Sequence, residues 1–139
     1  MVPAVNIGVC DACGHTFAYE LIHNGFNDSA YAYCDECGMT ALIDDFGGRT
    51  PEGMPPYRAI TALGEASLAP CPCGGSFRAD AAPRCPGCRA VLSPEAAAVW
   101  IEASAPGTAR GWRWQRDWRG LYAIIVEGRV VSNPWRDDS

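Results

Sequence analysis

Eight cysteines constrain this chain more than any other feature. They fall into four close pairs, and no cysteine lies outside a pair. The pairs read Cys10-Asp-Ala-Cys13, Cys34-Asp-Glu-Cys37, Cys71-Pro-Cys73 and Cys85-Pro-Gly-Cys88. Two residues between thiols allow one tight turn to aim both sulfurs at a common point, as tetrahedral metal coordination requires. Four such pairs predict two four-cysteine sites, and zinc is the expected ion, at two per chain.

Disulfide bonding is the alternative use of paired cysteines, and it requires an oxidising compartment. The first residues, Met1-Val-Pro-Ala-Val-Asn, lack the basic start and apolar core of a secretory signal. The sequence also has no apolar run long enough to predict a membrane span. We therefore expect a cytoplasmic protein with reduced thiols and no membrane association.

The first two pairs flank a predicted β-hairpin. Residues 16–23 alternate in polarity, Asn24-Gly25 is a strong two-residue turn, and Tyr31 and Tyr33 lie on the return strand. Residues 10–37 resemble the zinc-ribbon families, rubredoxin-like proteins among them, in which two cysteine knuckles at the ends of short strands clamp one metal ion. The resemblance implies a metal-stabilised fold but no particular function, since ribbons serve in binding, assembly and accessory roles.

The four pairs can share two ions in more than one way. Sequential pairing is favoured because it closes the shorter loops, with only eleven residues between the third and fourth pairs. The predicted sites are then Cys10, Cys13, Cys34 and Cys37 for the first, and Cys71, Cys73, Cys85 and Cys88 for the second. The alternative is the cross-brace of RING-type domains, in which the first and third pairs share one ion and the second and fourth share the other. The Cys71–Cys73 spacing, one residue shorter than in the usual knuckle, keeps this alternative open.

The remaining elements are a helix and a second hairpin. Ser93-Pro94-Glu95 predicts a helix start, and the apolar face of the helix is expected to carry Val99, Trp100 and Ala103. Leu121 to Val131 predicts a β-hairpin that turns at Glu127-Gly128. Residues 57–64 fit a short helix or a strand.

The predicted class is α+β: a small, metal-stabilised fold of two zinc ribbons, one helix and a C-terminal hairpin. We expect an N-terminal ribbon over 1–47, a linker over 48–57, and a second ribbon with the helix and hairpin over 58–139. The linker is rich in glycine and proline and has no periodicity.

Charge is distributed unevenly along the chain. The net charge is −5. Residues 1–57 hold eight acids and one arginine, whereas residues 58–139 hold ten arginines and eight acids. Four tryptophans and six arginines lie in residues 104–139, where Trp112, Arg113, Trp114 and Arg116 form the candidate contact strip. Such a strip suits a partner protein or nucleic-acid bases, although large aromatics also supply the core of a small domain.

No catalytic residue is predicted. The chain has no phosphate-binding loop, no Gly-x-Ser-x-Gly turn and no His-Glu-x-x-His motif, and closed four-thiolate sites are structural. His15 is expected beside the metal or exposed, and His23 is expected to be a hairpin residue. The sequence therefore predicts a zinc-binding, non-enzymatic module that contacts another protein. The alternatives are a nucleic-acid-binding ribbon, an iron-binding electron carrier like rubredoxin, and a RING-type domain; a hydrolase working near His23 would need a cleft and an oriented acid.

Overall fold

The computed structural model describes residues 6–23, 30–43, 62–104, 118 and 122–136. Within these ranges the chain is an α+β fold with two sheets, one helix of three turns and one single helical turn. The strands are β1 (Asn6–Val9), β2 (Thr16–His23), β3 (Ala30–Cys34), β4 (Thr40–Ile43), β5 (Phe77–Arg78), β6 (Tyr122–Val126) and β7 (Val130–Ser132), and the helices are α1 (Ala62–Glu65) and α2 (Pro94–Ser104). In this part of the chain no helix combines the length and apolar character needed to span a membrane.

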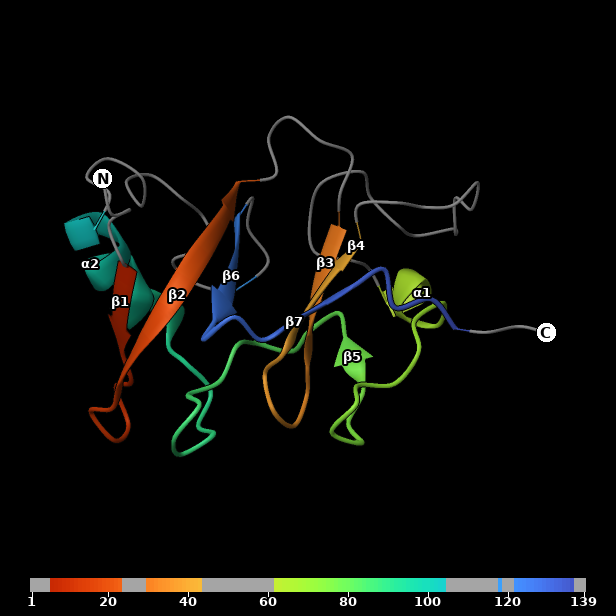
Figure 1. Cartoon of the computed structure of the whole chain (residues 1–139), viewed down its shortest axis with the longest axis horizontal. Coiled ribbons are helices and arrows are strands. Elements are labelled where there is room, and N and C mark those ends of the chain that lie inside the picture. Colours follow the sequence, from red (N-terminus) through yellow and green to blue (C-terminus); the bar gives the residue numbers. More distant parts are fainter. Residues whose placement is uncertain (1–5, 24–29, 44–61, 105–117, 119–121, 137–139) are drawn as a thin grey trace.

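The first sheet has the strand order β1-β2-β6, and α2 lies beside β1 at one end of the molecule (Figure 1). Gly8 of β1 makes this close packing feasible, because a Cβ there would lie 2.6 Å from the Phe17 ring and 3.3 Å from that of Trp100. Trp100 also packs against Tyr19, with ring centroids 4.7 Å apart. The aromatic side chains of β2 and α2 therefore form the core on this side of the molecule.

The predicted start of α2 is confirmed. The Ala96 N–H donates to Oγ of Ser93 at 3.2 Å, which makes Ser93 the N-cap. The predicted apolar face is only partly right. Trp100 packs on the sheet, but Val99 is 72% exposed, whereas Ala97 and Ile101 are fully buried. Alanine-rich sequence on several sides of the helix obscured which stripe faces the core.

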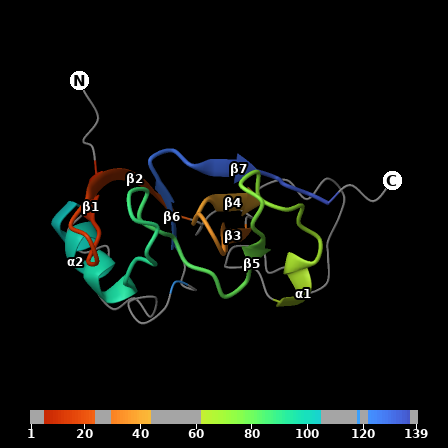
Figure 2. The same cartoon turned by 90° about the horizontal axis from the view of Figure 1, so that it is seen from below.

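The second sheet has the order β5-β3-β4-β7, and Figure 2 shows these strands side by side beyond β6. Its central strand β3 is buried on both faces. Tyr31 and Tyr33 point into the core that the first sheet shares with α2, while Ala32 and Cys34 point into a second core around Phe77. Since β3 contributes to both cores, it ties the two halves of the molecule together.

Two buried hydrogen bonds join the sheets at one residue of β6. The N–H of Ile124 donates to Oη of Tyr33 at 3.1 Å, and Oγ1 of Thr40 donates to the Ile124 carbonyl at 2.7 Å. The Tyr33 pKa is raised because the phenol is buried, so this group stays neutral. Side chains from the second sheet thus satisfy the outward-facing backbone groups of an edge strand of the first.

Neither predicted hairpin pairs its own two strands with each other within the described residues. Strand β2 pairs with β1 on one side and β6 on the other, so no edge is left for β3. The predicted turn at Asn24-Gly25 lies outside the described residues.

At the C-terminal hairpin, Glu127 and Gly128 have φ of 54° and 68°, and the Arg129 N–H donates to the Val126 carbonyl at 3.0 Å. This is the predicted two-residue turn. Its two strands nevertheless diverge, because β6 joins β2 while β7 pairs parallel with β4.

The predicted boundary at 48–57 does not separate two units among the described residues. Each sheet combines strands from 1–47 with strands from 58–139. The residues of the linker itself lie outside the described ranges. Each half of the molecule contains elements from both parts of the chain, with β1, β2, α2 and β6 in one half and β3, β4, α1, β5 and β7 in the other (Figure 1).

Candidate metal centres

The eight cysteines gather into two sets of four. We call Cys10, Cys13, Cys85 and Cys88 the outer set, and Cys34, Cys37, Cys71 and Cys73 the inner set, because the inner set lies between the two halves of the outer set in the sequence. Within each set all four sulfurs lie within 4.8 Å of one another. All eight are free thiols rather than disulfides.

The sulfur separations match tetrahedral coordination. In the outer set, Sγ of Cys10 lies 3.7 Å from that of Cys88, and Cys13 lies 3.8 Å from Cys85. The corresponding distances in the inner set, Cys34–Cys73 and Cys37–Cys71, are 3.5 and 3.6 Å. A tetrahedron with zinc–sulfur bonds of about 2.3 Å has sulfur–sulfur edges of about 3.8 Å. Each set could therefore hold one metal ion.

This grouping corrects the predicted pairing. The first pair of cysteines meets the fourth and the second meets the third, so neither the sequential arrangement nor the RING-type cross-brace describes the sites. Loop closure does favour sequential pairing, but only by a small free energy. The nested arrangement closes longer loops at an added cost of roughly 2 kcal/mol, and burying one aromatic or aliphatic side chain contributes about 1.5–3 kcal/mol. Packing of β3 and β6 thus outweighs the shorter loops.

Three of the four turns share one backbone pattern. The N–H of Cys10 donates to the carbonyl of His15 at 2.9 Å, and the Gly14 N–H donates back to the Cys10 carbonyl at 2.9 Å. The same two bonds recur in the turns that begin at Cys34 and Cys85. The residue after the second cysteine has positive φ in each case: Gly14 at 77°, Gly38 at 76° and Arg89 at 63°. Glycine adopts this conformation at little cost, which suits Gly14 and Gly38 to these positions.

The Cys71–Cys73 turn is the same knuckle shortened by one residue. The Cys71 N–H donates to the Gly75 carbonyl and the Gly74 N–H donates to the Cys71 carbonyl, both at 2.9 Å. Gly74 has φ of 100°, outside the range that other residues adopt easily. The short spacing therefore does not prevent this pair from completing the inner set.

Backbone N–H groups point at several of the sulfurs. The N–H of Ala12 lies 3.3 Å from Sγ of Cys10, and that of Glu36 lies 3.4 Å from Cys34. Gly75 and Gly87 donate in the same way to Cys73 and Cys85. Such donors stabilise negative charge on sulfur, so the turns favour thiolates, the form that binds metal.

Each set consists of one Cys-Asp knuckle and one Cys-Pro knuckle. The Asp11 carboxylate accepts the Ser93 N–H at 3.3 Å, and the Asp35 carboxylate accepts the Ser76 N–H at 3.0 Å. Each aspartate thereby fixes its own hairpin to the segment that carries the partner knuckle. The sequence holds a signal for this arrangement that sequence reasoning missed. The pattern Cys-Asp-x-Cys-Gly-x-Thr occurs twice, at 10–16 and 34–40, so the two Cys-Asp knuckles are equivalent and each needs a Cys-Pro knuckle as partner.

The thiols within one set differ in their pKa values. The pKa of Cys73 is lowered to about 7, mainly by the backbone N–H of Gly75 and also by the neighbouring thiols. Burial raises the pKa of Cys71, and the neighbouring thiols add to the increase. In the outer set, burial opposes ionisation of Cys10, but N–H groups and the Cys88 thiol outweigh it and bring the pKa to about 7. Each set thus forms one thiolate readily, and four thiolates together require a cation.

Two arginines contact the backbone of the knuckles. Arg84 donates from Nη1 to the Arg89 carbonyl at 2.8 Å and from Nη2 to the Asp35 carbonyl at 3.0 Å. Arg129 donates from Nη1 to the Cys37 carbonyl at 3.1 Å. Neither arginine was singled out in the sequence, because only the fold brings residues 84 and 129 to the turn at 34–38.

Neither histidine belongs to a cysteine set among the described residues. His15 is exposed and lies against the knuckle at 85–88, where a Cβ on Gly87 would approach its Cγ to 3.3 Å. The expectation that His15 lies beside the site is confirmed. His23 ends β2, but its side chain lies outside what the structure describes, so its role stays a prediction.

The candidate contact strip, Trp112, Arg113, Trp114 and Arg116, lies outside the described residues. The nearby Trp118 is a core residue. It is 6% exposed, and its indole N–H donates to the Leu92 carbonyl at 2.7 Å. Trp135 packs partly buried against the second core, where it bridges to Leu68. These tryptophans serve packing, as the core interpretation of the aromatic residues predicts.

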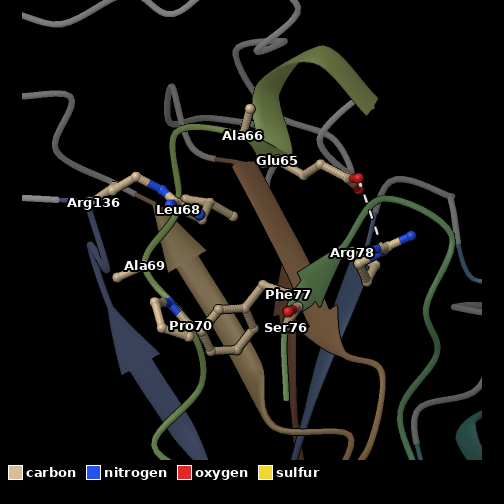
Figure 3. Close-up of a pocket in the computed structure, with 9 residues that line it drawn as sticks. All are labelled: Glu65, Ala66, Leu68, Ala69, Pro70, Ser76, Phe77, Arg78 and Arg136. Carbon is tan, nitrogen blue, oxygen red and sulfur yellow. Dashed lines mark ion pairs between the residues drawn. The ribbon is translucent and has the colours of Figure 1, made fainter. Parts of the chain in front are cut away.

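Near the inner set, α1 and β5 border a hollow of about 290 Å³ (Figure 3). On one wall Nε of Arg78 lies 3.8 Å from Oε1 of Glu65, and Oε2 of Glu65 accepts the Ala79 N–H at 2.6 Å. The Glu65 carboxylate is thus already occupied in holding β5 to α1. Arg136 lines the opposite side, and its backbone N–H donates to the Ser67 carbonyl at 2.9 Å. The polar groups of the hollow hold the fold together and do not converge on one point.

With the two sets defined, the comparison with known protein families is informative. A family model, described as a domain of unknown function (DUF8255), matches residues 7–93. The chain belongs to this family. The matched region contains all eight cysteines of the outer and inner sets, together with β1 to β5, and ends as α2 begins. No curated protein and no solved structure matches the chain. The DUF8255 region therefore coincides with the metal-site framework, while α2, β6 and β7 complete the two cores.

Proposed function

We propose that the chain binds two zinc ions, one in the outer set and one in the inner set, and that both ions are structural. The observation that carries this proposal is the convergence of four sulfurs in each set, with facing pairs 3.5–3.8 Å apart. Thiolates in a tetrahedral arrangement suit zinc, and such sites contribute on the order of 10 kcal/mol or more to folding at neutral pH. Each ion would hold together two knuckles that are up to about 70 residues apart in the sequence.

The proposed sites are closed, and this supports a non-enzymatic role. A zinc ion with four protein thiolates keeps no open position for water or substrate. The ions would instead fix the fold as a platform for contacts with another molecule. We propose that this partner is a protein, and that Trp112, Arg113, Trp114 and Arg116 belong to the contact surface. A reducing compartment such as the cytoplasm would keep the thiols available for metal.

Charge argues for a protein partner over nucleic acid. The chain carries −5, and each four-thiolate zinc site would add −2, which brings the total to −9. A surface this acidic repels a phosphate backbone unless basic residues are concentrated locally. We expect a mixed-sequence oligonucleotide to show no salt-sensitive binding in fluorescence anisotropy between 50 and 200 mM salt. Binding that weakens steeply over this range and is lost in Trp112→Ala/Trp114→Ala would favour the nucleic-acid alternative.

The metal content of the protein purified without added metal tests the central part of the proposal. Two zinc ions per chain in a colourless sample are expected. Iron with a red absorption spectrum would replace the structural-zinc proposal by the rubredoxin-like alternative. Fewer than two metal ions in a fully folded chain would contradict both the structural-zinc proposal and the rubredoxin-like alternative. Some of the thiols would then be available for other chemistry.

A further inference from the structure

Arg84 bridges the two metal centres. It lies at the start of the hairpin that carries Cys85 and Cys88 of the outer set, and its own Nη1 braces that hairpin through the Arg89 carbonyl. Its Nη2 reaches across to the Asp35 carbonyl, within the knuckle that carries Cys34 and Cys37 of the inner set. One rigid guanidinium therefore holds a ligand loop of each set at the same time.

The backbone of Arg84 makes a second connection to the inner set. A Cβ on Gly38, the residue after Cys37, would meet the Arg84 backbone nitrogen and would lie 2.7 Å from the Arg84 Cβ. The two knuckles are therefore in direct contact, and one cannot shift without moving the other. Nε of Arg84 is buried and has no hydrogen-bond partner among the described residues. Keeping that N–H buried is costly, so the remaining contacts of Arg84 must offset the cost.

We infer that Arg84 makes binding of metal at the two sets cooperative. The inference rests on the proposed function, since it requires both sets to bind metal. Loading either set turns its four sulfurs into a centre of net charge −2, which attracts the guanidinium and orders the loop that it braces. Because the same guanidinium holds the other loop, the second set is preorganised for its ion. The positive charge between the centres also reduces their mutual repulsion.

The effect can be measured as a population. Coupling between two sites usually changes affinity about 5- to 150-fold. For two sites of equal affinity at half saturation, tenfold coupling lowers the single-metal species from about one half to about one quarter of the molecules. Native mass spectrometry of the reduced full chain, titrated with zinc to half saturation, counts the molecules with zero, one and two ions.

The expected result is a single-metal fraction that is higher in Arg84→Gln than in the unchanged chain. Arg84→Lys keeps the charge but loses the planar fork, so its fraction should lie between the two. Arg129→Gln is the matched control. Its guanidinium donates only to the Cys37 carbonyl among the side-chain contacts of the described residues, so it should change inner-site affinity with little loss of coupling. Arg78→Gln, which loses an exposed ion pair, controls for removal of charge alone.

Either of two results with the variants would overturn the inference. If all the variants take up two ions and Arg84→Gln and Arg84→Lys show the same single-metal fraction as the unchanged chain, coupling does not run through Arg84. If Arg129→Gln or Arg78→Gln raises the fraction as much as Arg84→Gln, the effect is one of general charge or stability. An unchanged chain that takes up fewer than two ions would refute the proposed function as well, so the two failures are distinguishable. If Arg84→Gln does not fold even with zinc, the single-metal fraction of Arg84→Lys tests the inference instead.

Discussion

The contact between the inner and outer knuckles can be tested by comparing two glycines. Gly14 and Gly38 follow the second cysteine of equivalent knuckles, and their φ angles are 77° and 76°. Alanine at either position has the same backbone penalty, about 1–2 kcal/mol for a left-handed residue, partly offset by about 0.4–1 kcal/mol from the stiffer unfolded chain. Gly14→Ala should therefore cost about 1 kcal/mol, since no described residue other than its chain neighbours has an atom within 4 Å of its Cβ position.

Gly38→Ala should cost considerably more. The new Cβ would lie 2.7 Å from Cβ and 3.0 Å from Cα of Arg84, and backbone cannot yield as a flexible side chain does. Overpacking of this kind costs about 1–3 kcal/mol, which brings the expected total to about 2–4 kcal/mol. The measurement is denaturant unfolding of the zinc-loaded chains, with zinc content determined in parallel. Equal losses in the two variants would show that the two knuckles do not touch. This result would refute the close contact between Gly38 and Arg84.

Three further predictions follow from individual contacts. Thr40→Val should lower the unfolding free energy by about 1–3 kcal/mol, because it leaves the buried Ile124 carbonyl without its donor. Thr16→Val, at the exposed equivalent position in the first knuckle, should be nearly neutral. Equal effects of the two substitutions would contradict the account. Arg89→Gly relieves a φ of 63° at an exposed position and should raise stability by about 0.5 kcal/mol in thermal unfolding, whereas a loss of more than about 1 kcal/mol would show that the side chain matters. Zinc affinity should rise with pH between about 6 and 8, since the metal-free chain holds protons that the bound thiolates lack. Calorimetry in two buffers of different ionisation enthalpy should show release of about three protons per ion, and affinity independent of pH would refute thiolate ligation.

The local structure could be predicted because local physics determines it. Paired cysteines with a following glycine specify the knuckle wherever they occur, and Ser93-Pro94-Glu95 specifies a helix start. The Glu127-Gly128 turn likewise formed as its residues require, with both φ angles positive. In each case the hydrogen bonds that stabilise the structure connect residues within five positions of one another.

The assembly of these parts could not be predicted from the same signals. Which strand lies beside β2 depends on how the tyrosines of β3 pack against β6. The local hairpin patterns contain no information about this long-range packing. Loop length favoured sequential pairing by only about 2 kcal/mol, too little to decide against a well-packed alternative. The repeated Cys-Asp-x-Cys-Gly-x-Thr pattern was a better guide, because equivalent knuckles should have equivalent partners.

The measurement that tests the nested metal sites most directly is the zinc content of Cys13→Ser/Cys88→Ser after challenge with a chelator. Both cysteines are exposed, so the substitutions disturb packing little. In the nested arrangement both belong to the outer set, and the chain should keep one zinc ion, held by the four unchanged thiols of the inner set. Sequential or cross-braced pairing would instead remove one ligand from each site. A variant that holds two weakened ions, or none, would contradict the account.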